Sequence, residues 1–340
     1  MIKFMHWGKK PEGASAKEPH HPPVSDRPPA PAGLAEPGPP PFHDVPGALL
    51  DDTFAEAFGM AGTGLIITAP TAEWALEAAR SATGFATSVI GCGVEAGIDY
   101  EMAPEDTPDG RPGVRILLFS FSAEALQKHV EARAGQCILT APGTACFAGV
   151  ARTDRPIKLG AHLRYFGDGF QSSKMIGDRR YWRIPVMDGE FVCEDETFAV
   201  ADAVGGGNLI LLGRSQAEVL RVAEIAAAAM RGVPDVILPF PGGLVRSGSK
   251  VGSKYKSMIA STNEAYSPVL RGRVASSLES EVESVLEIVI DGLSADAVAK
   301  AMAVGIEAAL EAGGGLVRIT AGNYGGALGP HHFHLRKLVA

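Results

Sequence analysis

The stretch NLILLGRSQAEVLRVAEIAAAAMRGVPDVILPF, residues 208–240, contains one complete strand–helix–strand unit. Its first residues, Asn208–Leu212, are an apolar run that predicts a strand. Ser215 and Glu218 have the spacing of a capping box, which predicts that a helix begins there and continues through the alanine-rich run. Asp235–Phe240 predicts a second strand, which a Pro-Gly-Gly turn ends.

The same order of elements recurs along the chain. After residue 284 come a predicted strand at Val285–Ile290, a helix at Ala295–Leu310 and a strand at Leu316–Thr320. The first half has the same pattern, with predicted strands at Leu65–Ala69, Phe85–Gly91, Val114–Phe121 and Gln136–Thr140 and helices at Thr71–Ala82 and Ala123–Arg133. Each half therefore reads β-α-β, loop, β-α-β. The sequence predicts an α/β (α+β) protein of two pseudo-repeated, ferredoxin-like split βαβ lobes.

These patterns divide the chain into four parts. Residues 47–154 are the predicted N-terminal lobe and residues 208–340 the C-terminal lobe. Residues 155–207 are an inserted antiparallel hairpin region, with strands at Leu163–Phe166, Arg180–Pro185 and Phe191–Cys193. The C-terminal lobe also contains a long loop, 246–284, and loops of this length in compact domains often serve function.

Residues 1–46 differ in composition from the rest, because they hold 12 of the 24 prolines. Proline-rich segments favour extended conformations that cannot bury a core. We expect this part to be a flexible tail.

Composition limits the classes of partner. The formal net charge is −8, and only 3 Trp and 6 Tyr are available for stacking on bases, so we expect no nucleic-acid partner. No run of 18 apolar residues and no signal-peptide pattern occurs, so we expect no membrane partner and a cytoplasmic protein. The four cysteines are widely spread, and the spacing of His331, His332 and His334 does not suit one helical face. We therefore expect no metal site.

Glycine, serine and lysine residues gather between residues 242 and 254. The order of residues in Gly243–Lys250 does not match a nucleotide-binding P-loop. Backbone amides, hydroxyls and ammonium groups in one loop still suit an anionic substrate tail, with a solvated loop as the alternative. The candidates are Ser247, Ser249, Lys250 and Lys254.

Glu287 alternates with aliphatic residues on a predicted strand. If its side chain points away from the sheet into solvent, it is an ordinary surface charge. If it points into a cleft, desolvation raises its pKa towards the range of a general acid or base at neutral pH. Spacing alone leaves both interpretations open.

Ten segments, taken together and in their order along the chain, favour one family: Asp51–Phe58, Ala82–Phe85, Glu95–Ile98, Thr107–Val114, Phe166–Gly169, Pro239–Gly243, Ser247–Ser253, Ala260–Glu264, Glu287–Gly292 and Ala321–Gly329. This set resembles the formylmethanofuran:tetrahydromethanopterin formyltransferase family. The resemblance extends from about Asp51 to the C-terminus.

The resemblance implies transfer of a formyl group between a furan-amine coenzyme, methanofuran or methylofuran, and N5 of tetrahydromethanopterin. Both are cosubstrates, and no tightly bound cofactor or metal is implied. The resemblance also implies a homotetramer of two-lobed subunits, as in the family. In methylotrophic bacteria, such an enzyme is one subunit of a formyltransferase/hydrolase complex that releases formate. The alanine-rich, moderately acidic chain and its proline-rich start favour that bacterial version.

The resemblance also assigns roles. Glu287 matches the strand glutamate of the family and is the expected general acid/base. Backbone amides of Gly242 and Gly243 or of the Gly325-Gly326 pair, or the side chain of Asn323, are candidates for stabilising the oxyanion. Tyr324 is a candidate for stacking on the furan or the pterin, with local packing as the alternative.

Two other functions compete with this one. The chain could be a non-catalytic scaffold or pterin-binding subunit of a hydrolase complex, or a small-molecule regulator on a ferredoxin-like fold. The first would need a damaged Glu287 or glycine loop, and both are intact. The second would not preserve the ordered loop segments.

Overall fold

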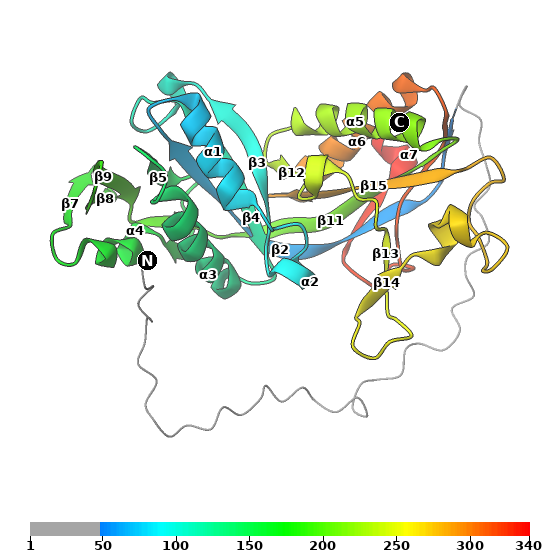
Figure 1. Ribbon diagram of the computed structural model, residues 1–340, viewed down its shortest axis with the longest axis horizontal. Helices are drawn as coiled ribbons and strands as arrows, with labels where there is room; N and C mark the ends of the chain where they lie inside the picture. Colours follow the sequence, from blue (N-terminus) through cyan, green and yellow to red (C-terminus); the bar gives the residue numbers. More distant parts are fainter. Residues whose placement is uncertain (1–47) are drawn as a thin grey trace, which may run out of the picture. The chain divides into compact units, whose positions relative to one another are not determined.

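The computed structural model describes residues 48–340, a mixed α/β protein built on a large mixed sheet (Figure 1). The predicted tail, 1–46, lies outside the described residues. Two long strands, β2 (Phe54–Thr68) and β11 (Val200–Gly213), pair antiparallel and join the two halves of the chain. In the described part of the chain, 13 strands belong to this sheet.

In the first half, the strands pair in the order β3-β4-β2-β5, and all these neighbours are antiparallel. Helices α1 and α3 pack against these strands, and their alanine, leucine and valine side chains enter one hydrophobic core. The elements are β2, α1 (Ala72–Thr83), α2 (Val89–Cys92), β3 (Glu95–Met102), β4 (Gly113–Ser120), α3 (Ala123–Arg133) and β5 (Ala145–Ala148).

In the second half, the strands pair in the order β12-β15-β11-β16, again all antiparallel. Helices α5 and α6 cover one face of these strands and form a second core (Figure 1). The elements are β11, α5 (Gln216–Arg231), β12 (Val236–Ile237), β15 (Ser284–Gly292), α6 (Ala295–Ala312) and β16 (Leu316–Thr320). Short strands β1 (Leu49–Leu50) and β17 (His331–His334) and helix α7 (Leu335–Leu338) complete this half.

Between the halves, β7, β8 and β9 are antiparallel neighbours joined by tight turns, and β6 pairs with β10. The elements are β6 (Pro156–Lys158), α4 (Gly160–Leu163), a 3₁₀ turn (Arg164–Gly167), β7 (Ser172–Ile176), β8 (Arg179–Val186), β9 (Gly189–Glu194) and β10 (Glu196–Phe198). The strand predicted at Leu163–Phe166 is wrong, because this segment is helical.

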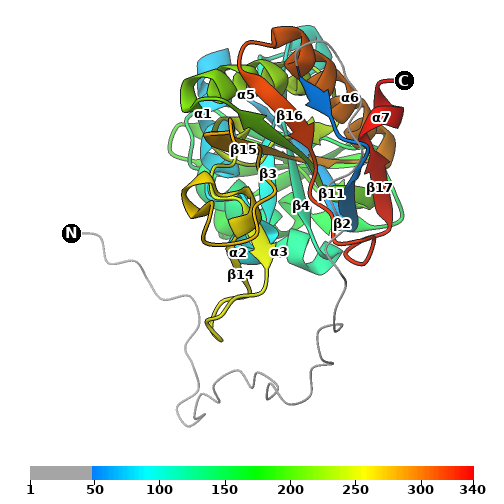
Figure 2. The ribbon, with the colours of Figure 1, turned by 90° about the vertical axis from the view of Figure 1, so that its right-hand side faces the viewer.

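The long loop 246–284 contains a small hairpin of β13 (Ser249–Val251) and β14 (Ala260–Thr262) and two 3₁₀ turns, Glu264–Tyr266 and Pro268–Leu270. Figures 1 and 2 place it on the side of β15 that α5 and α6 do not cover. This helix-free face of the C-terminal half, on which the loop lies, is where the candidate site lies.

Side-chain caps explain why the four long helices begin where they do. The hydroxyls of Thr71, Ser122, Ser215 and Ser294 each accept the N–H three residues later. One half of the predicted capping box forms, the bond from the Glu218 N–H to the Ser215 hydroxyl. The Glu218 carboxylate bonds the Ser215 hydroxyl at 2.8 Å instead of the Ser215 backbone N–H. Within residues 48–340, none of the helices has the length and apolar character needed to span a bilayer.

Strand β2 is far longer than the predicted Leu65–Ala69. Its first part is rich in glycine and alanine, and this hides the apolar alternation by which strands are recognised. Small residues are required here by close neighbours. A Cβ at Gly62 would lie 2.8 Å from the Leu293 side chain, and one at Gly64 would lie 2.8 Å from the carbonyl oxygen of Gly149.

Two other predicted strands are wrong, and a third is shorter than expected. Phe85–Gly91 forms a turn and the start of α2. Phe85 is 83% exposed, and its φ of 49° is not a strand conformation. Gln136–Thr140 lies in and just after a π-helical continuation of α3 (Ala134–Ile138). In Asp235–Phe240, only Val236 and Ile237 pair as a strand.

Candidate active site

Glu287 lies on β15, on the face away from α5 and α6. Its neighbours Ile288 and Ile290 are buried in the core beneath those helices. Because side chains alternate along a strand, Glu287 shares the opposite face with Val285, which packs in a second apolar cluster with Ile210 and Tyr266. The backbone of Glu287 is held on both sides, by Ile210 of β11 and by Val245, which directly precedes the long loop.

This apolar surrounding changes the acidity of the carboxyl group. Burial raises the pKa of Glu287 to about 7. A carboxyl group with that pKa is present in both protonation states near neutral pH, so it can accept a proton in one step and return it in the next.

A second glutamate, which the sequence analysis did not single out, organises the neighbouring loop 321–330. Glu56 of β2 is 2% exposed. Its Oε2 accepts the N–H groups of Tyr324 at 2.7 Å and Gly326 at 3.1 Å, and its Oε1 accepts those of Gly329 at 2.9 Å and Leu328. The sequence signal that could have identified Glu56 is its place between two alanines, Ala55 and Ala57, in a segment that matches the family.

Tyr324 is a side chain of this loop that lies near the helix-free face. It is 40% exposed. Burial raises its pKa, the nearby charges of Glu287 and Glu56 add to the rise, and a hydrogen bond with the backbone of Val251 opposes it. The structure therefore brings Tyr324 together with Glu287 and with β13.

Asn323 and the Gly325-Gly326 pair lie in the same loop, but their donors are already used. Asn323 Nδ2 donates to Thr53 Oγ1 and to Phe54 O, both at 3.1 Å. Gly325 donates its N–H to Asn323 Oδ1 at 3.3 Å, and Gly326 donates to Glu56. In this structure these groups hold the loop in place.

The serine and lysine candidates lie on and around the β13–β14 hairpin. Ser247, Ser249 and Lys254 are exposed. Lys250 forms an ion pair with Glu264, and this hydrogen bond lowers the pKa of the Glu264 carboxyl. Val251 of the same hairpin lies near Tyr324, so the hairpin that carries these residues approaches the Glu287 face.

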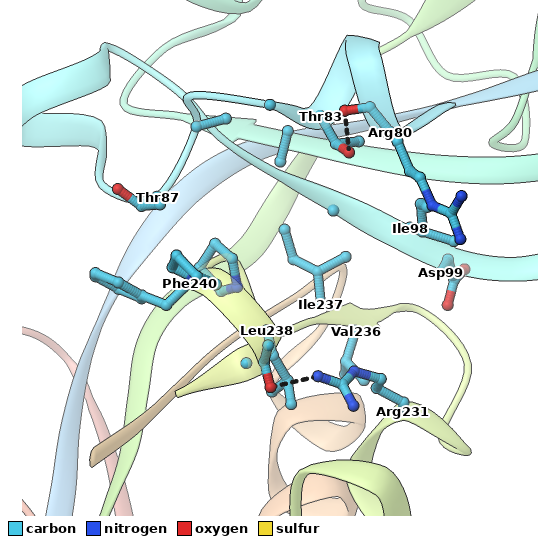
Figure 3. A pocket seen from close by; sticks show the side chains of 18 of the residues that line it. Arg80, Thr83, Thr87, Ile98, Asp99, Arg231, Val236, Ile237, Leu238 and Phe240 are labelled. Atoms are coloured by element: carbon cyan, nitrogen blue, oxygen red, sulfur yellow. Dashed lines mark hydrogen bonds between the residues drawn. The ribbon is translucent and has the colours of Figure 1, made fainter. Parts of the chain in front are cut away.

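Gly242 and Gly243 line a pocket of about 560 Å³ between β3 and the segment 236–243 (Figure 3). Gly242 has a φ of 62°, and a Cβ there would meet nothing within 4 Å. Its carbonyl accepts a hydrogen bond from Arg231, whereas the Gly243 N–H is used by Phe240 O. Glu287 is not among the pocket's lining residues, but its backbone is hydrogen-bonded to Val245, two residues after that segment.

Charged side chains join the two halves beside this pocket. Arg115 of β4 donates to Asp99 and to Asp235, both at 2.6 Å. Burial raises the pKa of Asp99 to about 6, partly opposed by Arg115. This cluster holds β3 against the turn that precedes β12.

The C-terminal histidines are part of β17, where His332 and His334 lie against the ring of Phe54. Among residues 48–340, no group of three or more histidine, cysteine or carboxylate side chains is arranged to hold a metal ion.

Comparison with known proteins identifies the family. Residues 44–186 match the formylmethanofuran-tetrahydromethanopterin formyltransferase model, and residues 189–338 match the model of its proximal lobe. The chain is 60% identical over 300 residues to one of the subunits of the formyltransferase/hydrolase complex of Methylorubrum extorquens, covering 86% of this chain and 96% of that protein. It is 58% identical to the formylmethanofuran–tetrahydromethanopterin formyltransferase of Methylococcus capsulatus, covering 87% of this chain and 99% of that one.

Two solved structures match the fold of this chain over most of its length. The crystal structure of the Methylorubrum extorquens complex with methylofuran matches with a TM-score of 0.86 at 59% identity, covering 88% of this chain and 99% of that one. The Methanosarcina barkeri formyltransferase matches with a TM-score of 0.83 at 42% identity, covering 87% and 100%. The chain belongs to the formylmethanofuran–tetrahydromethanopterin formyltransferase family and is a formyltransferase.

Proposed function

We propose that this enzyme transfers a formyl group from N5 of tetrahydromethanopterin to the amine of methylofuran, and that Glu287 moves the proton. The observation that carries this proposal is a carboxyl group with a pKa of about 7 on the helix-free sheet face. Methylofuran is favoured over methanofuran because the crystal structure of the 59% identical Methylorubrum extorquens protein is of a complex with methylofuran.

The chemistry needs a proton shuttle. Attack of the furan amine on the formamide carbon forms a new C–N bond and leaves an oxyanion and an ammonium group. The Glu287 carboxylate takes the ammonium proton and returns it to the pterin nitrogen as the old C–N bond breaks. Holding both coenzymes in one site supplies much of the remaining rate enhancement.

The other candidates surround this step. Gly242 faces open space and is the candidate for close approach of a substrate. Lys250 and Lys254, with Ser247 and Ser249, are proposed to bind acidic coenzyme tails through charge-assisted hydrogen bonds. Tyr324 is proposed to stack on one of the two rings. Asn323 is proposed to act by holding the loop, since its amide donors already bond Thr53 and Phe54.

We propose that the enzyme assembles as a homotetramer in the cytoplasm and joins hydrolase subunits that release formate, in formaldehyde oxidation during methylotrophic growth. The support is the likeness to a component of the Methylorubrum extorquens formyltransferase/hydrolase complex. A size measurement of the co-expressed proteins tests it: a single species containing this chain and hydrolase subunits supports the assembly, and separate elution contradicts it.

We also propose that the two halves are repeats of one ferredoxin-like unit, divided as lobes 47–154 and 208–340 with the region 155–207 between them. The support is the shared pairing order, β3-β4-β2-β5 in one half and β12-β15-β11-β16 in the other. Separate expression of residues 47–154 and of residues 200–340, which keeps β11 whole, tests it, because a true lobe is expected to retain helical and strand content.

The direct test of function is an assay with purified wild-type enzyme, formyl-tetrahydromethanopterin and methylofuran. Transfer that needs both coenzymes together and survives a metal chelator supports the proposal. Binding of the pterin without transfer to any furan amine would favour the scaffold function instead.

A further inference from the structure

Four backbone N–H groups of one loop converge on a single buried carboxylate. The loop 321–330 curls around Glu56 so that Tyr324 and Gly326 bond one oxygen, and Leu328 and Gly329 bond the other. Such concave arrangements of backbone N–H groups bind anions. Here the anion is supplied by the protein itself, from strand β2.

The loop is shaped to fit this carboxylate. Gly325 and Gly326 have φ values of 68° and 82°, which L side chains rarely adopt and which allow the chain to turn around Glu56. Gly329 packs directly on β2, since a Cβ there would lie 2.2 Å from the carbonyl oxygen of Ala57. The start of the loop is fixed as well, because Gly322 donates to Asn208 Oδ1 at 2.6 Å.

The direction of the pKa shift of Glu56 agrees with an ionised carboxylate. Burial alone would raise the pKa of Glu56, yet its pKa lies below the ordinary value, because the loop's N–H groups lower it. A buried charge is expensive unless it is fully hydrogen-bonded. The four N–H groups provide that compensation, so the anion and the loop conformation stabilise each other.

Tyr324 is the residue that this arrangement places. Its N–H is the first of the four on Glu56, and its side chain lies near Val251 of β13 and within the field of Glu287. We propose that Glu56 is a positioning residue of formyl transfer, which acts by fixing Tyr324 beside the Glu287 face. The effect on formyl transfer rests on the proposed role of that face. The fixing of the loop by Glu56 does not depend on it.

Glu56→Gln is the variant that tests this most sharply. A glutamine keeps the shape and offers one oxygen, but its NH₂ group would face two N–H donors that have lost their acceptor. We expect faster hydrogen–deuterium exchange at residues 324–329 and a fall in kcat/KM of about tenfold, as expected when a hydrogen-bonded charge is lost. Glu194→Gln is the matched control, because Glu194 is similarly buried, accepts the N–H of Ala148 at 3.0 Å and lies in β9 of the hairpin region.

A double-mutant cycle with Tyr324→Ala separates positioning from general stability. If Glu56 acts through Tyr324, Glu56→Gln lowers kcat/KM in the wild-type background and has little further effect in the Tyr324→Ala background. If the two losses simply multiply, or if the exchange of residues 324–329 is unchanged, the proposal is wrong.

Two further results are needed if Glu56→Gln does not fold or if wild type shows no transfer. If Glu56→Gln does not fold, Gly326→Ala weakens the same hydrogen-bond set from the loop side, since Gly326 has a φ of 82°, and the same coupling with Tyr324→Ala is expected. If wild type shows no formyl transfer, the proposed function fails, whereas the exchange experiment still decides whether Glu56 holds the loop.

Discussion

Two glutamates near Tyr324 differ in what surrounds the carboxylate. Glu56 accepts four backbone N–H groups, and its pKa lies below the ordinary value despite burial. Glu287 lies among apolar side chains, and burial raises its pKa to about 7. The surroundings therefore favour the ionised form of the side chain in one place, and in the other they bring its pKa to near neutral pH. The number of hydrogen-bond donors, rather than burial alone, decides which.

Asp291 extends this comparison to a third case. It is fully buried, accepts one N–H, from Gly206 at 3.1 Å, and lies beside Glu95. Burial and then the charge of Glu95 raise its pKa well above the ordinary value. One donor does not offset the effect of burial on the pKa of Asp291, whereas four donors do so for Glu56.

The largest expected effect comes from removing the carboxyl group that we propose as the proton carrier. Glu287→Gln is expected to lower kcat/KM for formyl transfer by about 10²-fold or more, because a neutral amide cannot move a proton. Glu283→Gln, an exposed glutamate just before the same strand, is the matched control and is expected to retain activity.

The same variant separates catalysis from stability. The native pKa of Glu287 lies above its unfolded value, so the ionised wild type loses stability as pH rises from about 4.5 towards 7. Glu287→Gln removes this cost and is expected to match or exceed the Tm of wild type at pH 8. A large fall in Tm together with the fall in activity would point to a structural role instead.

Asp291→Asn is expected to change the pH dependence of stability. The raised native pKa means that folded wild type holds a proton which the unfolded chain releases above about pH 4. Wild type therefore loses stability as pH rises, and the asparagine variant loses less. We expect the difference in Tm between pH 5.5 and pH 8 to shrink by roughly 2–4 °C, a change of about 1 kcal/mol.

Thermal unfolding of Glu307→Gln provides the control for this measurement, because Glu307 is exposed on α6. Its pH dependence is expected to equal that of wild type. An identical pH dependence of Tm in Asp291→Asn and wild type would mean that Asp291 is ionised in the folded protein.

Tyr324→Phe is expected to have the smallest effect. The ring stays available for stacking, and only the hydroxyl, which lies near the Val251 backbone, is lost. A single neutral hydrogen bond corresponds to a change of about threefold, which we expect in KM rather than in kcat. Steady-state kinetics with each coenzyme varied in turn will detect it, and a loss as large as that of Glu287→Gln would give the phenol a chemical role.

The sequence predicted elements well where local signals were complete. Helix α6 was expected at Ala295–Leu310 and runs over Ala295–Ala312, because Ser294 caps it and its apolar residues have helical spacing. Strand β16 was predicted with its observed bounds, Leu316–Thr320. Most of β2 was missed, because its glycines and alanines are chosen for close strand packing, which only the neighbouring strands reveal.

The site was predictable only in part, for a related reason. Alternation placed Glu287 on one face of a strand, but whether that face is desolvated depends on Ile210 and Tyr266, which are distant in sequence. Glu56 was missed because its partners lie about 270 residues away in the chain. For the same reason, the N–H of Gly326 appeared free in the sequence and is bonded in the structure, whereas the N–H of Gly325 bonds locally to Asn323 Oδ1.

The most direct test of the account is the pH profile of kcat/KM for formyl transfer to methylofuran, for wild type and Glu287→Gln, between pH 5 and 9. We predict that the wild-type value rises with pH through an apparent pKa of about 7, as the Glu287 carboxylate becomes available as a base, and levels off above it. The variant is predicted to be slower at pH 8 and to lack this inflection. An unchanged rate and an unchanged inflection in Glu287→Gln would contradict the role of Glu287 as the proton carrier.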